Sequence, residues 1–352
     1  MARIFPPAPD PGAQGVICAA CHLAGTGCIL DARVNQIRGR NTKFRINQDR
    51  LVDCAFGSYV PGCDGDPDPE RPFAIYRAQA IANLHAAGAI NFPDVGDELG
   101  YRAGSINAQA LAKVQGDIYE ILEAAALWNA AADWNAFMDT GFWPAGPFEQ
   151  PAGSVPTPLR RIAIVKLPRN YDSTRLLTNA SRAAYQAFQQ SLERQGMVLR
   201  LSSPDIVGVR IPDPMPDAYQ SFLRRLPDLS MANYRLLQGA HQAIEGTLDG
   251  RNFLFAIAVK TSTRSDRLYQ PLFEANVLKF IIGFVLRGSS LRFHAHMENF
   301  DGADVEGAYR AASLPSLLLG GRPQKAIDKL YQAVNPRATA QEILNEMPLF
   351  PL

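Results

Sequence analysis

The segment from Phe253 to Lys260 is the strongest constraint on how this chain of 352 residues can fold. Its sequence, FLFAIAVK, is apolar without interruption until the final lysine. A near-continuous apolar run of this length predicts a strand buried at the centre of a sheet. Side chains alternate along a strand, so Ala256, Ala258 and Lys260 are expected on one face, where two small residues leave space beside the lysine.

Further strands and helices are expected on either side of this run. Alternation predicts strands at 161–167, 206–211 and 291–298, and helical periodicity predicts helices at 107–138, 178–195, 268–286 and 324–332. Strands that interleave with helices predict an α/β or mixed α+β fold around a central sheet. With 47% hydrophobic residues, the chain can bury a large core.

The overall composition gives weaker constraints. A formal net charge of +1 argues against a promiscuous nucleic-acid binder, but it is compatible with a site-specific one that uses local arginine clusters. The first residues, MARIFPPAPDPG, lack the apolar segment of a signal peptide, and no apolar run reaches the roughly 18 residues that span a bilayer. We therefore expect a cytoplasmic protein whose five cysteines stay reduced.

A carboxylate and a lysine lie at the ends of two expected strands. Asp205 follows a proline and opens the strand at 206–211, while Lys260 closes the central strand. Hydrolysis of a phosphodiester at neutral pH needs a divalent metal, which lowers the pKa of bound water and neutralises the leaving oxygen. Mg²⁺, with Mn²⁺ as a substitute, binds one or two carboxylates and keeps several waters. Asp205 suits such a metal, and Lys260 suits the attacking water.

The second acid must come from outside the central strand. The common nuclease pattern, PD…(D/E)-x-K, places it two residues before the lysine, where this chain has Ala258. Glu274 on the following helix is one candidate, and Glu120 is another, since it shares a helix face with Lys113 and Asp117. Each residue also has an ordinary interpretation: a solvated strand end, a surface glutamate, or an i, i+4 salt bridge.

A dense charged motif, RSDR, begins the helix expected after the central strand. Arginine bound to guanine O6 and N7 is the commonest base-specific contact, and a carboxylate accepts from cytosine N4. Arg264, Asp266 and Arg267 at a helix amino terminus in the major groove would suit two G·C pairs, so a two-fold dimer would read CCGG. Taken alone, such a tetrapeptide is more often a surface charge cluster.

Three segments, at 112–135, 202–209 and 258–277, together resemble the type II restriction endonucleases that recognise a CCGG core. The similarity extends over roughly residues 35–331. It implies an α/β (mixed α+β) fold of the PD-(D/E)xK restriction-endonuclease-like kind, with a central mixed sheet flanked by helices. The endonuclease domain, with its DNA-recognition elements and dimer interface, would occupy 35–352, after an amino-terminal extension at 1–34.

The resemblance also implies roles for the candidate residues. Metal binding falls to Asp205, Glu120 and the main-chain carbonyl of Val259, while Lys260 and Glu274 complete the catalytic group. A second set would bind DNA. Arg264, Asp266 and Arg267 would read the CCGG core, Lys113 would lie near the DNA, and Arg40 would belong to the outer, degenerate part of the site.

The implied activity is Mg²⁺-dependent hydrolysis of double-stranded DNA by direct attack of water, in restriction–modification defence. The site would be a palindrome such as CRCCGGYG, cut to leave four-base 5′ overhangs. The enzyme would act as a homodimer, with higher-order assembly on DNA left open. Two alternatives remain: a related nuclease of different specificity, and a non-catalytic DNA-binding protein on the same scaffold. The intact set of acids and lysine argues against the second, because a binding protein has no use for carboxylates close to phosphates.

The cysteines near the amino terminus leave other possibilities open. The motif CAACH at 18–22 matches a c-type haem attachment site, although the chain shows no signal peptide for the export that such attachment needs. A structural Zn²⁺ on Cys18, Cys21 and Cys28 is a second possibility, with a fourth ligand from His22, Cys54 or Cys63. Reduced, unpaired thiols are the favoured interpretation.

Two pairs of aromatic side chains have ordinary interpretations. His294 and His296 alternate on one expected strand and could form a two-histidine metal face, but satisfied imidazoles on a half-buried strand are favoured. Trp128 and Trp134 lie on the apolar stripe of the helix at 107–138 and are expected in the core.

Overall fold

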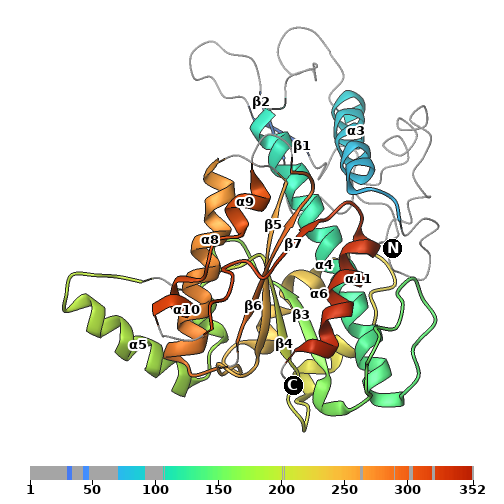
Figure 1. Ribbon diagram of the computed structural model, residues 1–352. Coiled ribbons are helices and arrows are strands. Elements are labelled where there is room, and N and C mark those ends of the chain that lie inside the picture. The colour runs from blue at the N-terminus through green and yellow to red at the C-terminus, as the bar shows by residue number, and fades with distance from the viewer. Residues whose placement is uncertain are drawn as a thin grey trace.

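A five-stranded mixed sheet forms the centre of the computed structural model (Figure 1). The structure describes residues 30–33, 43–46, 70–91, 106, 108–199, 201, 203–261, 265–288, 290–300, 304–318 and 322–350. The sheet order follows the chain: β3 (Ile162–Lys166), β4 (Ile206–Arg210), β5 (Phe253–Lys260), β6 (Arg292–Met297) and β7 (Lys329–Gln332). The first three strands pair antiparallel and the last three pair parallel.

The central strand, β5, confirms the prediction from its apolar run. It has the predicted bounds, all eight of its residues are buried, and β4 and β6 pair with it on either side. The strands predicted at 161–167, 206–211 and 291–298 are also present, within one or two residues of the predicted bounds. The fold is therefore the mixed α/β arrangement that the interleaved pattern predicts.

Helices cover both faces of the sheet (Figure 1). On one face lie α4 (Ala108–Thr140) and α11 (Pro336–Glu346), which contact each other, and α4 also contacts β3. On the other face lies α8 (Ser265–Phe280), extended by a π-helical turn, η6 (Ile281–Val285). These two layers remove both faces of β5 from water, as a fully apolar strand requires.

Helix α4 is held against the sheet by polar contacts as well as apolar ones. The Asn135 side chain accepts from the Ile162 amide at 2.8 Å and donates to the Ile162 carbonyl at 2.8 Å. Trp128 and Trp134 are buried, as predicted, and their indole N–H groups donate to main-chain carbonyls at 2.8 and 2.7 Å. Such contacts fix the rotation of α4, and hence the direction of its polar residues.

The remaining elements are shorter or lie at the periphery. They are β1 (Leu30–Arg33), β2 (Lys43–Ile46), α3 (Phe73–Asn91), η3 (Pro158–Arg160), η4 (Ser173–Leu176), α5 (Asn179–Glu193), η5 (Asp217–Leu223), α6 (Met231–Gly239), α7 (His241–Ile244), α9 (Val305–Tyr309), α10 (Leu314–Leu318) and η7 (Met347–Leu349). Among the helices that the structure describes, none combines the length and the apolar composition of a membrane span.

The prediction of a helix at 324–332 is wrong. The segment instead ends in strand β7, which pairs with the outer edge of β6 from His294↔Lys329 to Met297↔Gln332. Asp328, just before the strand, accepts from the Phe293 amide at 2.7 Å and forms an ion pair with Lys279 at 2.6 Å. These partners are distant in sequence, so tertiary pairing overrides the local helical pattern.

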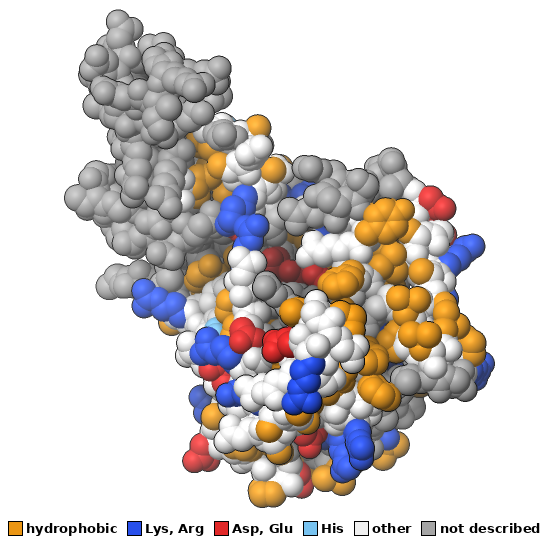
Figure 2. All heavy atoms as spheres, turned by 90° about the vertical axis from the view of Figure 1, so that its left-hand side faces the viewer, with side chains coloured by type: hydrophobic (Ala, Val, Ile, Leu, Met, Phe, Trp, Pro, Cys, Tyr) orange, Lys and Arg blue, Asp and Glu red, His pale blue; other side chains and the backbone are white. Residues whose placement is uncertain are grey.

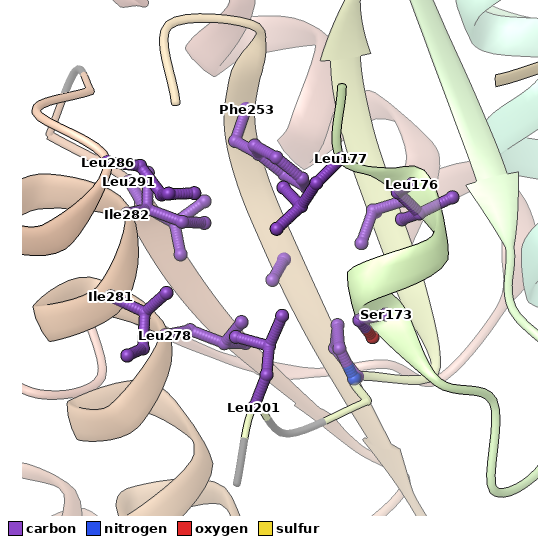
Figure 3. A pocket seen from close by; sticks show the side chains of 13 residues that line it. Ser173, Leu176, Leu177, Leu201, Phe253, Leu278, Ile281, Ile282, Leu286 and Leu291 are labelled. Carbon is purple, nitrogen blue, oxygen red and sulfur yellow. The ribbon is translucent and has the colours of Figure 1, made fainter. Parts of the chain in front are cut away.

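A small apolar pocket lies between α8, η6 and the sheet (Figure 3). Leucine and isoleucine side chains line most of it, and its polar member is Ser173, whose buried hydroxyl has no hydrogen-bond partner among the described groups. The pocket contains no charged side chain, so it offers nothing for acid–base or metal chemistry.

Candidate active site

The antiparallel pairing of β4 and β5 brings Asp205 and Lys260 together. Asp205 directly precedes β4, and Lys260 ends β5, so both lie at the same edge of the sheet. The Lys260 Nζ atom lies 2.9 Å from Asp205 Oδ2, and the Val259 amide donates to the same oxygen at 2.7 Å. The Asp205 main chain bonds to Ile257 on one side and Leu167 on the other. This carboxylate is therefore held rigidly, as a catalytic group requires.

Glu120 reaches the same edge from helix α4. Its carboxylate forms an ion pair with Lys166, the last residue of β3, at 2.5 Å. Lys166 pairs in register with Ile206, the neighbour of Asp205. Burial raises the pKa of Glu120, the charge of Lys166 opposes that rise, and the charge of Asp205 adds to it. The repulsion between Glu120 and Asp205 shows that two carboxylates converge here.

Glu274 approaches from the opposite layer, on helix α8. Its side chain is buried and accepts from Gln270 Nε2 at 2.7 Å. Burial acts to lower the pKa of Lys260, but the neighbouring charges of Asp205, Glu274 and Glu120 outweigh it, so the pKa of Lys260 is raised. A lysine held protonated in this way is suited to orient a water molecule and to neutralise phosphate charge, rather than to accept a proton.

The sheet edge thus collects charged groups from both helical layers. His296 contacts Glu123 of α4 and shares a register position with Val259, so these two side chains lie on the α4 face. Lys260 is the next residue along the strand, so its side chain points to the α8 face. Lys166 and Glu120 belong to the α4 side. Asp205 lies between the two groups and interacts with both. Figure 2, which views the side of the molecule with α8, α10 and α5, shows acidic side chains recessed near the middle of that face.

The oxygen donors fit a hard divalent cation. Asp205 and Glu120 supply carboxylates, and the Val259 amide bonds to Asp205, so the Val259 main chain lies beside that carboxylate. Mg²⁺ is bound through one or two carboxylates and retains several waters. Among the described residues, no group of three or more His, Cys, Asp or Glu side chains is arranged to hold a metal. A cation here would therefore complete its shell with main-chain oxygen and water.

The predicted DNA-binding residues are only partly described. Arg264 and Arg40 lie outside the described residues, and Asp266 and Arg267 belong to the first turn of α8, where the side chains are not described. Lys113 on α4 forms an i, i+4 ion pair with Asp117 at 2.6 Å. That pair matches the ordinary interpretation of both residues, and it leaves any role of Lys113 with DNA as a prediction.

The two histidines of β6 are fully buried, not half-buried as predicted. His296 Nδ1 forms a hydrogen bond with the carboxylate of Glu123 on α4. His294 differs from the prediction of satisfied imidazoles, because neither of its ring nitrogens has a hydrogen-bond partner among the described groups. Both side chains lie on the sheet face opposite Lys260, on the side of α4. The cysteines considered for haem or zinc all lie outside the described residues.

Lys166 was not among the residues that the sequence predicted for this site. It closes an apolar run one residue before the end of the strand predicted at 161–167, and Lys260 closes the apolar run of the central strand in a similar way; that parallel is the feature in the sequence that could have identified it. Without the pairing of β3 with β4, nothing in the local pattern connects Lys166 with Asp205 or Glu120.

Comparisons with known proteins agree on one family. The family model described as Cfr10I/Bse634I restriction endonuclease matches residues 99–346, which is more than half of the chain. A crystal structure of the type IIF restriction endonuclease Bse634I with cognate DNA is similar, with a TM-score of 0.65, 16% identity, and coverage of 93% of this chain and 99% of that one. A structure described as Bse634I restriction endonuclease has a TM-score of 0.67 and 15% identity, with the same coverage. No curated protein sequence matches the chain.

Proposed function

We propose that this chain, a type II restriction endonuclease of the Cfr10I/Bse634I restriction endonuclease family, cleaves double-stranded DNA at a palindrome with a CCGG core. The observation that carries the proposal is the contact of Lys260 with Asp205 at the sheet edge, a few residues before helix α8, whose first three residues belong to the RSDR motif. The catalytic Lys260 and the base-reading residues would then be separated by only a few residues of the chain.

The proposed reaction is hydrolysis of a phosphodiester by water, with Mg²⁺ as the cofactor and Mn²⁺ as a substitute. When bound, the cation would polarise the phosphate and lower the pKa of water. Asp205, Glu120 and the Val259 carbonyl would hold it, as their shared position at one edge supports. Lys260, kept protonated by the surrounding acids, would orient water and balance charge on the phosphate, and Glu274 would hold Lys260 in that state.

The proposed recognition depends on the amino terminus of α8. Arg264 and Arg267 would read guanines, and Asp266 would accept from cytosine N4, so that two subunits read CCGG. The segments at 112–135, 202–209 and 258–277 resemble those of the CCGG-core enzyme SgrAI. On that basis the full site would be CRCCGGYG, with Arg40 near its outer bases, Lys113 near the DNA, and four-base 5′ overhangs after cleavage.

We propose a homodimer as the active form, because a palindrome presents the same half-site twice. One structural relative, Bse634I, is described with cognate DNA, which supports duplex DNA as the partner here. The endonuclease domain would cover 35–352 and follow an extension at 1–34. In the cell, the protein would serve a restriction system.

Sequencing of cut ends tests the proposal. Purified protein would be incubated with Mg²⁺ and DNA of genomic complexity, beside the variant Lys260→Ala. We expect ends that share CCGG and a four-base 5′ overhang, absent with the variant and with chelator. Defined ends around another palindrome would keep the endonuclease and reject the CCGG core. Absence of any defined ends with the wild-type protein, on DNA that carries several CRCCGGYG sites, would reject the proposed activity.

A further inference from the structure

Asp205, Glu120, Glu274, Lys260 and Lys166 form an acidic cluster at the sheet edge. It contains one positively charged side chain, Lys166, that has no role in the proposed reaction. Lys166 is buried at the end of β3, and its Nζ atom lies 2.5 Å from Glu120 Oε1. A weaker contact joins the same Nζ to the Leu167 carbonyl at 3.4 Å. A buried lysine is costly unless it is paired, so this residue and Glu120 depend on each other in the absence of a metal.

The place of Lys166 in the sheet puts this ion pair beside the catalytic carboxylate. Lys166 is in register with Ile206, and the following residue, Leu167, donates its amide to the Asp205 carbonyl at 2.9 Å. The Lys166 side chain extends towards α4 from this position and meets Glu120 there. The direction of the Glu120 carboxylate is therefore set by a residue of the same sheet edge that carries Asp205.

We propose that Lys166 is a positioning residue that holds Glu120 beside Asp205 and competes with the divalent cation for the Glu120 carboxylate. The inference rests on the proposed function, in that it takes Asp205 and Glu120 as the ligands of the cation. Lys166 and Lys260 have separate partners and separate tasks: Lys260 contacts Asp205 from the α8 side, whereas Lys166 contacts Glu120 on the α4 side.

Replacement of Lys166 by a neutral side chain should have two opposite effects, one on cation binding and one on cleavage. Three carboxylates (Asp205, Glu120, Glu274) and two lysines (Lys166, Lys260) give the cluster a formal charge of −1, which becomes −2 without Lys166. A cation should therefore bind more tightly when Lys166 is replaced by a neutral side chain. DNA cleavage should become slower in the same variant, because a freed Glu120 no longer has a fixed direction.

Calorimetric titration of the full-length protein with Mn²⁺, without DNA, tests the inference. The variants are Lys166→Met, which keeps the length of the side chain, Glu120→Gln, and both together. We expect Lys166→Met to lower the Kd for Mn²⁺ about tenfold, and to change it by less than about twofold in the Glu120→Gln background, where the competition is already absent. Cleavage by Lys166→Met at saturating Mg²⁺ should fall about tenfold or more.

Equal or weaker binding of Mn²⁺ by Lys166→Met would overturn the inference, as would an equal gain in both backgrounds. Lys166→Arg keeps the charge and should leave the Kd for Mn²⁺ within about twofold of wild type, which covers the case in which the methionine variant does not fold. The titration contains no DNA. A protein that shows the expected Mn²⁺ binding but cuts no DNA would therefore reject the proposed function and leave the role of Lys166 intact.

Discussion

Glu123 on α4 and His296 on β6 are joined by a hydrogen bond, and neither side chain is exposed to solvent. Glu123 lies one helical turn from Glu120, and His296 is in register with Val259, the neighbour of Lys260. The pair therefore joins the helix that carries one acid of the site to the strands that carry the lysine. It fixes α4 against the sheet.

Loss of one partner of this pair should destabilise the fold strongly. His296→Leu fills similar space but leaves the Glu123 carboxylate buried without its partner, so the free energy of unfolding should fall by about 3–5 kcal/mol. Urea denaturation measures it. His294→Leu is the matched control, since it makes the same change two residues away, where no hydrogen bond is lost; it should cost less than about 1.5 kcal/mol. Equal losses in both variants would contradict the role given to the Glu123–His296 hydrogen bond.

His294 should make the fold sensitive to mild acid. Burial, and then the charges of His296, Arg292, Lys329 and Lys279, lower its pKa well below the ordinary value of 6.5, while Glu346 lies 3.7 Å away. The unfolded chain takes up a proton below that pH and the folded protein does not, so the free energy of unfolding should fall as the pH drops. Below pH 6.5 the wild type should lose about 1.4 kcal/mol per pH unit more than His294→Leu. Parallel curves of stability against pH would show that His294 is not held neutral.

Asp205→Asn separates catalysis from DNA binding. The change removes the carboxylate that contacts Lys260 while keeping the side-chain size, so the rate of cleavage should fall by at least about 10³-fold. Binding to a CCGG duplex in Ca²⁺, followed by fluorescence anisotropy, should change by less than about tenfold, because the proposed base-reading residues are intact. Asp217→Asn on the exposed start of η5 is a control for handling and should cleave as the wild type does. Cleavage by Asp205→Asn near the wild-type rate would remove Asp205 from the active site.

The residues of the site that lie at the ends of long apolar runs could be predicted from the sequence. The run that ends in Lys260 specifies a buried strand, and a proline followed by an acid marks the start of another at Asp205. Once both strands belong to one sheet, antiparallel pairing is enough to bring these two residues together. Glu274 could also be predicted, because it lies on the helix that follows the central strand.

Other parts of the structure depend on contacts that no local pattern encodes. Lys166 belongs to the cluster only because β3 pairs with β4, and the sequence between the two strands does not indicate the register of that pairing. The segment at 324–332 has a helical pattern, yet the free edge of β6 and the contacts of Asp328 make its end a strand. Glu123 and His296 are 173 residues apart, so their pairing follows from the packing of α4 on the sheet.

Lys113 offers a direct choice between an ordinary salt bridge and a contact with DNA. Its ion pair with Asp117 is exposed, so Lys113→Ala should change the free energy of unfolding by less than about 0.5 kcal/mol. If Lys113 also contacts a phosphate, the slope of log affinity against log salt should become shallower by about 1 in this variant. Asp117→Ala breaks the same salt bridge but keeps the lysine, and its slope should match that of the wild type. Anisotropy titrations at several salt concentrations measure the slopes, and the same slope for Lys113→Ala as for Asp117→Ala would leave Lys113 with a structural role alone.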